Sequence, residues 1–196
     1  MEQYSKLAEL FCYPEKASLK KALADINSIL YASYPQLSNS LDEFAAFAES
    51  HSTDSMREYF IKTFDIQASC YLDIGYVLFG EDYKRGTFLV HMIEEHKKAQ
   101  NDCGVELPDH LPNILRLLPK IKDKKLAEEL AYSLVLPALR EMQKNFLDEV
   151  NVYKKLLQLL TSIIEVDFKD SQYKQFSILS KDKTNFLNSI NCGPKT

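Results

Sequence analysis

Apolar residues recur every three or four positions along most of this chain, and no sustained stretch alternates apolar with polar residues. That spacing puts apolar side chains on one face of an α-helix, whereas a half-buried β-strand needs strict alternation. The chain has 196 residues, 45% of them hydrophobic and only five of them glycine. A chain of this length can bury a substantial core without metals or disulfides. We therefore predict an all-α, single-domain helical bundle.

The periodic segments give the approximate positions of the helices. From residue 167 onward polar residues become more frequent and the periodicity fades. We therefore expect a helical domain over residues 1–166 and a C-terminal tail over 167–196, which either docks on the body or is mobile. The expected helices lie near residues 4–11, 19–30, 37–48, 56–63, 65–80, 82–103, 111–118, 124–150 and 151–164.

Local signals mark several helix ends. Ser40-x-x-Glu43 and Ser55-x-x-Glu58 both have the capping-box pattern. Asn151 precedes an apolar run as an N-cap residue would, and Gly80 suits a C-terminal cap. Pro137 lies inside the long segment 124–150, where we expect it to kink the helix.

Composition excludes several classes of protein. Basic and acidic residues number 24 and 28 and are interspersed, which argues against a nucleic-acid-binding protein. No run approaches the roughly 20 apolar residues that span a bilayer, and the N-terminus lacks the pattern of a secretory signal. The four cysteines are far apart and form no CxxC pair, as in proteins of a reducing cytoplasm. We expect a cytoplasmic protein without direct membrane insertion.

The segment Glu106-Leu107-Pro108-Asp109-His110-Leu111-Pro112 is the strongest candidate for a site. Proline is tolerated in the first turn of a helix, so the segment is interpreted as a loop that leads into a helix over 111–118. It would hold Asp109 and His110 side by side at the helix entrance, where they can accept, donate or titrate. A plain N-cap role for Asp109 remains an equal alternative.

Other kinds of site find little support. His91 and His96 are five residues apart, about 140° around a helix, so they do not share a metal-binding face. Cys103, Glu106 and His110 could form a mixed site, but no further cluster supplies a fourth ligand. The chain has neither a Gly-x-Ser-x-Gly elbow nor a glycine-rich phosphate loop. We predict no metal, no cofactor and no catalytic residue.

Arg85 and Gly86 stand out near the start of the expected helix 82–103. Arg85 falls beside the inward-facing stripe, and a cation near a helix N-terminus opposes the helix dipole. A carboxylate partner would explain its position, with Asp65 or Asp109 as candidates, and a purely structural ion pair is an even alternative. Gly86 lowers helix propensity, which suggests that another element approaches closely there.

Several motifs together resemble one family, the assembly chaperones of molybdenum oxidoreductases. The likeness is to the nitrate reductase delta-subunit (NarJ) group within the wider TorD/DmsD family, and it runs from about residue 59 to 160. The motifs are Tyr59-x4-Phe64-Asp65, Cys70-Tyr71-Leu72, Phe79-Gly80-Glu81-Asp82-x-x-Arg85-Gly86, Glu106–Pro112 and Asn151-x-Tyr153-x-x-Leu156-Leu157.

The resemblance implies an all-helical, non-enzymatic chaperone of the TorD-like type. Such proteins hold the N-terminal peptide of a molybdopterin-containing catalytic subunit, often a twin-arginine-type leader or its remnant, while the molybdenum cofactor is inserted. By this resemblance, Asp109 and His110 are expected to line the peptide groove, with Glu106 and Pro108 beside them.

Three further residues match other motif positions of the family, namely Tyr71, Asp65 and Arg85. Peptide binding and a structural role are both open for them. The chain departs from the nitrate reductase group at Phe79-Gly80-Glu81-Asp82-Tyr83, where that group usually has His-Gly-Asp-Ser-Arg, and at Arg116, which replaces a common acid. These departures leave the client enzyme open, and another molybdenum or tungsten enzyme is an alternative to a nitrate reductase.

Two functions from other classes remain as alternatives. A structural subunit would stay in its oxidoreductase complex and co-purify with the mature enzyme. A small helical enzyme would use Asp109 and His110 as an acid–base pair beside a closed pocket. The oligomeric state, monomer or dimer, is left open.

Overall fold

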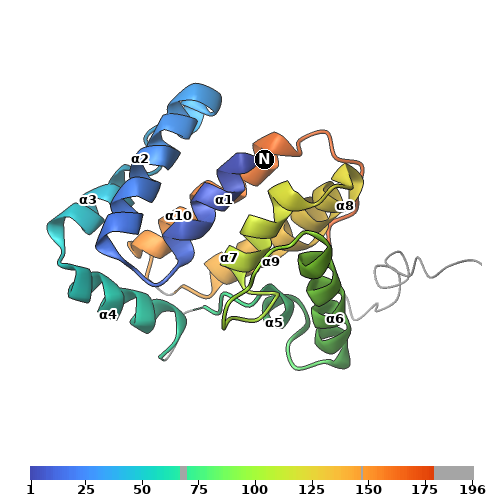
Figure 1. Ribbon diagram of the computed structural model, residues 1–196. Coiled ribbons are helices and arrows are strands. Elements are labelled where there is room, and N and C mark those ends of the chain that lie inside the picture. The colour runs from blue at the N-terminus through green and yellow to red at the C-terminus, as the bar shows by residue number, and fades with distance from the viewer. Residues whose placement is uncertain (67–69, 147, 179–196) are drawn as a thin grey trace, which may run out of the picture.

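The computed structural model describes residues 1–66, 70–146 and 148–178 (Figure 1). Within these ranges the protein consists of helices and one isolated β-bridge, with no strand, which confirms the predicted all-α fold. None of the described helices is both long and apolar enough to cross a membrane. The helices are α1 (Glu2–Ala8), α2 (Lys16–Ser33), α3 (Asp42–Ser50), α4 (Thr53–Phe64), α5 (Ile74–Phe79), α6 (Tyr83–Lys98), α7 (Leu111–Leu117), α8 (Lys124–Glu129), α9 (Leu136–Lys144) and α10 (Val152–Asp167), with the short 3-10 helices η1 (Glu9–Phe11), η2 (Pro35–Leu37) and η3 (Leu118–Lys120) and a π-helical segment η4 (Leu130–Val135).

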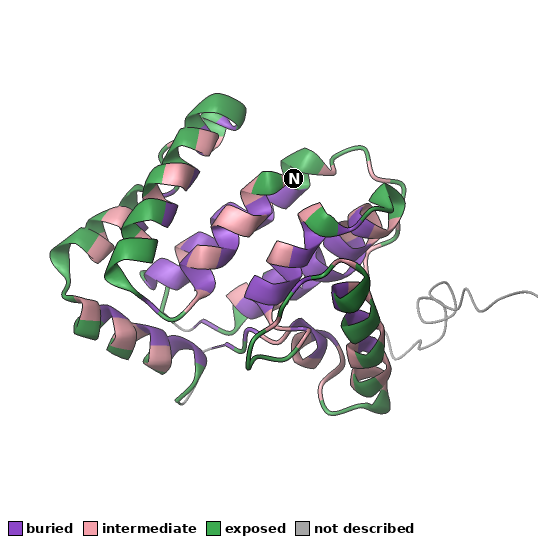
Figure 2. Ribbon diagram, viewed as in Figure 1, coloured by how far each residue is buried: buried purple, intermediate pink, exposed green. Residues whose placement is uncertain are grey.

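The core lies where α1 packs on α7 and where α9 packs on α10. Figure 2 shows these helices buried along much of their length, while α2 and α6 expose one side. An aromatic cluster around Tyr153 of α10 joins α3 and α4 to this core. The Tyr153 ring lies 5.4 Å from Phe44, 5.7 Å from Phe60 and 4.9 Å from Phe64, measured between centroids, in edge-on arrangements. Such pairs add to the stability already gained from burying the rings.

Two of the three predicted N-caps are wrong. Helix α4 begins after Ser52, whose Oγ accepts a hydrogen bond from the Ser55 backbone N–H at 3.1 Å, so Ser55 lies inside the helix rather than at its cap. Helix α3 has no side-chain cap, because the residue before it is Leu41, whose side chain has no hydrogen-bond acceptor. The third prediction is confirmed, since Asn151 Oδ1 accepts from the Tyr153 N–H at 2.9 Å.

The prediction of a helix over residues 65–80 is wrong for most of this range. Only α5 is helical, and Gly80 ends it with a positive φ of 63°, as predicted for a C-terminal cap. The preceding backbone instead pairs with the segment before α7. The Ile74 N–H donates to the Asp109 carbonyl at 2.9 Å, and the Leu111 N–H donates to the Leu72 carbonyl at 2.8 Å.

The helix expected to reach residue 103 ends at Lys98. Gln100 adopts a left-handed backbone with φ 51°, the only non-glycine residue to do so in the described part of the chain. The glycine that was expected to end the helix, Gly104, lies four residues further on and also has a positive φ, of 62°. A non-glycine residue in this conformation is uncommon, so helical periodicity could not predict that the helix ends here.

The long helix expected over 124–150 is divided into α8, η4 and α9 and ends at Lys144. Pro137 has no N–H to donate to the carbonyl of Ser133, and the wider π-helical turns lie just before it. The Ser133 carbonyl accepts instead from the Phe176 N–H at 2.9 Å. The break at Pro137 therefore provides an acceptor for the chain that follows α10.

That following chain contacts the body through several aromatic rings. Phe176 packs edge-on against Phe79, with 5.2 Å between ring centroids, and Phe168 stacks on Tyr4 at 6.5 Å. At the end of α10 the Asp167 carboxylate accepts hydrogen bonds from the Tyr4 hydroxyl at 2.7 Å and, through its other oxygen, from the Tyr34 hydroxyl at 2.6 Å. The division into 1–166 and 167–196 stays a prediction, and residues 179–196 lie outside the described residues.

Candidate functional site

The proline-bracketed segment leads into α7, as predicted. Pro112 occupies the first turn of that helix, and His110 stands at its N-cap position without a side-chain capping bond. Asp109 does not cap α7. Its Oδ2 accepts a hydrogen bond from the Gly75 N–H, 3.1 Å away in the first turn of α5, so it supports the start of a different helix. The antiparallel bridge between Asp73 and His110 holds the two helix entrances together.

Arg85 of α6 connects two carboxylates at this junction. Its Nη2 lies 3.2 Å from Asp73 Oδ2, and its Nε lies 3.6 Å from Asp109 Oδ2. Asp109 was one of the two predicted partners, whereas Asp65 at the end of α4 makes no ion pair with Arg85. The guanidinium also lies over the ring of Tyr76, 5.3 Å from its centroid. Such a cation–π contact further fixes the arginine.

His110 joins this network through Asp73, whose Oδ1 lies 3.2 Å from His110 Nδ1. The result is a continuous chain of charged and polar groups from Asp109 through Arg85 and Asp73 to His110. Burial is greatest at Asp109, whose side chain is 0% exposed, whereas the side chains of Arg85, Asp73 and His110 are 22%, 29% and 18% exposed. Of these four residues, only Asp109 is closed to solvent.

Asp109 has the electrostatic signature of a buried carboxyl. Burial raises its pKa, and the nearby Asp73 carboxylate raises it further, while Arg85 and the Gly75 N–H act in the opposite direction. Asp109 Oδ1 and Arg85 Nε are buried without a hydrogen-bond partner in the structure. An unpaired buried charge is costly, so the Arg85 side chain is essential to keep this carboxyl inside.

Gly75 makes this close approach possible. A Cβ atom at Gly75 would lie 2.6 Å from Asp109 Oδ2 and 2.9 Å from the Phe88 ring, both shorter than real contacts allow. The sequence interpretation assigned a close approach to Gly86 instead, and within the described chain no element approaches that residue. A Cβ atom there would meet nothing within 4 Å. The glycine that another element approaches lies in α5, where no local pattern marked it.

His96 fixes the loop on the other side of Asp109. Its Nε2 lies 2.9 Å from the Pro108 carbonyl and its Nδ1 lies 2.9 Å from Asn101 Nδ2. A neutral ring that donates from Nε2 and accepts at Nδ1 satisfies both partners. Burial lowers the pKa of His96, which agrees with that neutral form.

A cleft of about 570 Å³ opens beside this network, between η1, α4 and the entrance of α7. Four of the residues expected at a peptide site line it: Asp65, Tyr71, Glu106 and His110. The other three do not. Arg85 and Asp109 stand behind the wall as supports, and the Pro108 carbonyl faces His96.

Two charged residues of the cleft, Asp73 and Arg116, were not predicted as site residues from the sequence. Asp73 precedes the apolar run of α5, a pattern typical of an N-cap, and that signal could have drawn attention to it. Arg116 also lines the cleft, where its guanidinium donates to Glu9 Oε1 at 2.9 Å and contacts Cys12 Sγ at 2.9 Å. No sequence signal linked Arg116 to Glu9, which is 107 residues away.

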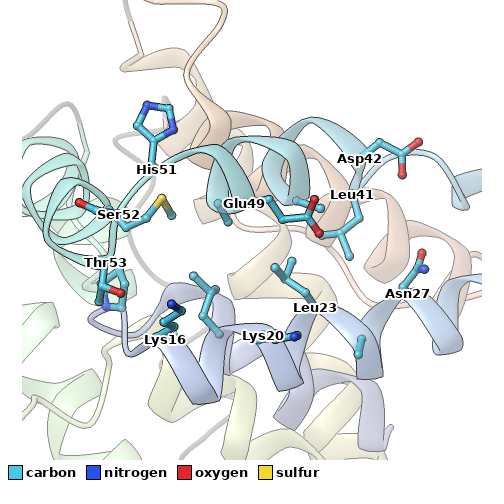
Figure 3. Close-up of a pocket in the computed structure, with 16 residues that line it drawn as sticks. Lys16, Lys20, Leu23, Asn27, Leu41, Asp42, Glu49, His51, Ser52 and Thr53 are labelled. Carbon is cyan, nitrogen blue, oxygen red and sulfur yellow. The ribbon is translucent and has the colours of Figure 1, made fainter.

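A second hollow of about 660 Å³ lies between α2, α3 and the start of α4, and we call it the α2–α3 groove (Figure 3). Leu23 of α2 and Leu41, the residue before α3, point into it. Lysines stand on the α2 side, and Asp42 and Glu49 stand on the α3 side. Its lining residues are Pro14, Lys16, Leu19, Lys20, Leu23, Ala24, Asn27, Leu41, Asp42, Ala45, Ala48, Glu49, His51, Ser52, Thr53 and Met56.

No cluster of His, Cys, Asp and Glu suited to a metal ion occurs among the described residues. The site is therefore an open, acidic cleft on a helical body, supported by a buried ion-pair network. These features fit the class indicated by the motifs, the molybdenum oxidoreductase assembly chaperones.

Comparison with known proteins points in the same direction. No family model matches the chain. It is similar to the probable nitrate reductase molybdenum cofactor assembly chaperone NarJ of Bacillus subtilis (strain 168), with 24% identity over 164 residues. The match covers 83% of this chain and 88% of the relative. This similarity supports the NarJ-type chaperone family as the class of this protein.

Proposed function

We propose that this protein is a cytoplasmic, non-enzymatic chaperone for the assembly of a molybdoenzyme similar to nitrate reductase. It binds the N-terminal, twin-arginine-type peptide of the catalytic subunit and supports insertion of the molybdenum cofactor. The observation that carries the proposal is the acidic cleft beside the Asp109–His110 segment. The similarity to the NarJ relative over most of both chains supports the assembly role.

The charge of the cleft suits a basic peptide. Asp65, Asp73 and Glu106 line it, and Asp65 and Glu106 make no ion pair in the described structure, whereas Asp73 is paired with Arg85 and the one arginine of the lining, Arg116, with Glu9. Basic side chains of a client peptide would meet these carboxylates at the rim, where charge complementarity favours encounter and orientation. Tyr71 lines the cleft and is 49% exposed, and an exposed tyrosine ring is a partner for the guanidinium of a client arginine.

Within this proposal Asp109 supports the site and does not touch the client. Its side chain is 0% exposed, so a bound peptide would meet His110 and Asp73 first. Asp109 anchors Arg85, Arg85 anchors Asp73, and Asp73 orients His110. The same burial argues against Asp109 as one half of an acid–base pair, because a substrate would have to reach it.

The test is the affinity for a synthetic peptide with the N-terminal sequence of a candidate client, measured by calorimetry. We expect micromolar or tighter binding to the wild type, and at least about tenfold weaker binding to a Glu106→Gln, His110→Ala double variant, equivalent to about 1.4 kcal/mol. Both side chains line the cleft without belonging to the core. Asp109→Ala is unsuitable, because it would disturb the buried network.

The matched control is Glu94→Gln on the exposed side of α6, which removes one acid away from the cleft. It should bind the peptide as the wild type does. Unchanged affinity in the folded double variant would exclude the cleft as the peptide site. Absence of binding to any molybdoenzyme N-terminus would contradict the proposed function itself.

A further inference from the structure

Helix α6 has a second apolar face, which nothing in the described chain covers. Its inner face packs on the body through Phe88 and Met92. On the opposite side Tyr83, Val90 and Ile93 are 77%, 56% and 55% exposed. A surface helix normally has one apolar stripe and one polar face, so two apolar faces indicate a second packing partner.

The outer residues have the spacing of a helix–helix seam. Residues 83, 86, 90, 93 and 97 follow alternating steps of three and four, as the a and d positions of a coiled coil do. Gly86 occupies one of these positions, is exposed, and has open space where a Cβ atom would be. A glycine in a helix weakens it, but at a seam it leaves a notch into which a partner's side chain can enter.

We propose that α6 pairs with α6 of a second copy of this chain, in antiparallel orientation about a two-fold axis beside Val90. In this register Val90 faces its own symmetry mate, and Ile93 of each copy enters the notch at Gly86 of the other. Such an isologous contact requires a self-complementary surface. The apolar seam and its notch meet that requirement.

Charge along the helix selects the antiparallel second copy as the occupant. Glu81 and Asp82 lie directly before α6, and Lys97 and Lys98 lie in its last turn, where Lys98 also pairs with Glu95 at 2.7 Å. The two-fold axis brings the acidic end of each helix beside the basic end of the other, and it also opposes the two helix dipoles. A parallel pair would place like charges together at both ends.

The proposed α6–α6 interface is small, so the dimer should be weak. One pair of 16-residue helices buries less surface than the roughly 1,200 Å² of a standard stable interface. We therefore expect a dimer that forms at high protein concentration and dissociates on dilution. The inference does not depend on the client peptide, because the seam faces away from the network of Arg85, Asp73 and Asp109.

Sedimentation velocity over a dilution series of the full chain tests the pairing. The wild type should show a concentration-dependent dimer at about 100 µM, and Val90→Glu and Val90→Lys should each weaken it at least about tenfold by placing like charges at the axis. An equimolar mixture of the two variants should recover the dimer as a heterodimer. A wild type that stays monomeric throughout, or a mixture that stays monomeric, would overturn the proposal.

Gly86→Gln is a second test. It combines weaker dimerisation with unchanged or higher thermal stability, a result that a misfolded variant would not give. The new side chain meets open space in the single chain, so the thermal unfolding temperature should stay the same or rise. In the proposed dimer it fills the notch needed by Ile93, so dimerisation should again weaken at least about tenfold. Dimerisation of this variant at wild-type strength would place the contact elsewhere on the surface and overturn the proposal.

Discussion

The cleft beside His110 and the α2–α3 groove are of similar size but are built in opposite ways. The cleft rests on a buried chain of ion pairs and on backbone pairing between the entrances of α5 and α7. The groove is a space between helices, floored by leucine and alanine side chains, with charges only at its edges (Figure 3). The polar region fixes geometry, whereas the apolar one offers surface for burial.

A conspicuous sequence motif can therefore mark the support of a site rather than the surface that binds a ligand. The Glu106–Pro112 segment attracted attention through its prolines and charges, yet its central acid, Asp109, is buried and works as a support. Leucines and alanines at helical spacing look alike whether they face the core or a hollow, so the groove had no motif. A client helix could lay its apolar side in the groove and its basic residues in the cleft, and the predictions below separate these contributions.

The largest effect is expected when the cleft network loses its cation. Arg85→Met should lower the free energy of unfolding by about 3 kcal/mol, because it leaves the Asp109 carboxylate buried and unpaired. The matched change in the groove, Lys20→Met, should alter stability by less than about 0.5 kcal/mol, because this lysine makes no ion pair in the described structure. Urea denaturation measures both. Equal losses would show that the two regions do not differ as proposed.

A smaller loss is expected from one added methyl group at the same network. Gly75→Ala should lower the free energy of unfolding by about 2 kcal/mol, because its Cβ would lie 2.6 Å from Asp109 Oδ2. Gly86→Ala makes the identical change in open space and should stabilise α6 by up to about 1 kcal/mol. Thermal denaturation of the two variants compares them directly. If Gly75→Ala is as stable as the wild type, the close approach is not a constraint.

The helical periodicity was enough to predict the fold class, because the spacing of apolar residues along the chain determines which face of a helix is apolar. It also placed α10 and its Asn151 cap, since a cap acts on the helix that it begins. It failed over residues 65–80, where backbone groups pair with a segment more than thirty residues later in the chain. Long-range pairing of this kind has no local signature.

The candidate site divides in the same way. The family resemblance pointed to Asp65, Tyr71, Glu106 and His110, all of which line the cleft. It could not distinguish lining residues from supports, because burial depends on contacts between distant segments. Arg85 illustrates this limit: the helix dipole argument correctly required a carboxylate, but Asp73, the nearer partner, was not considered.

The contribution of the groove to client binding is tested by filling it. Ala45→Gln places a longer side chain among the residues that line the groove, and it should weaken peptide affinity about tenfold if the client's apolar face lies there. Ala46→Gln, on the exposed side of the same helix, should leave affinity unchanged. Calorimetry with the peptide used for the cleft variants gives the comparison. Wild-type affinity in Ala45→Gln would leave the cleft as the sole peptide surface.

The smallest effect concerns pH and again separates the two regions. Burial lowers the pKa of His96 below its ordinary value of 6.5 in the folded protein, so the unfolded chain binds the proton more readily. The stability linked to His96 is therefore complete above about pH 6.5 and is lost as the pH falls through the unfolded and then the folded pKa. His96→Gln should remove this part of the pH dependence of unfolding between pH 7 and 5, whereas His51→Gln, at the exposed edge of the groove, should keep it. A wild-type pH profile in His96→Gln would mean that the bond from His96 to Pro108 does not hold the loop in a proton-dependent way.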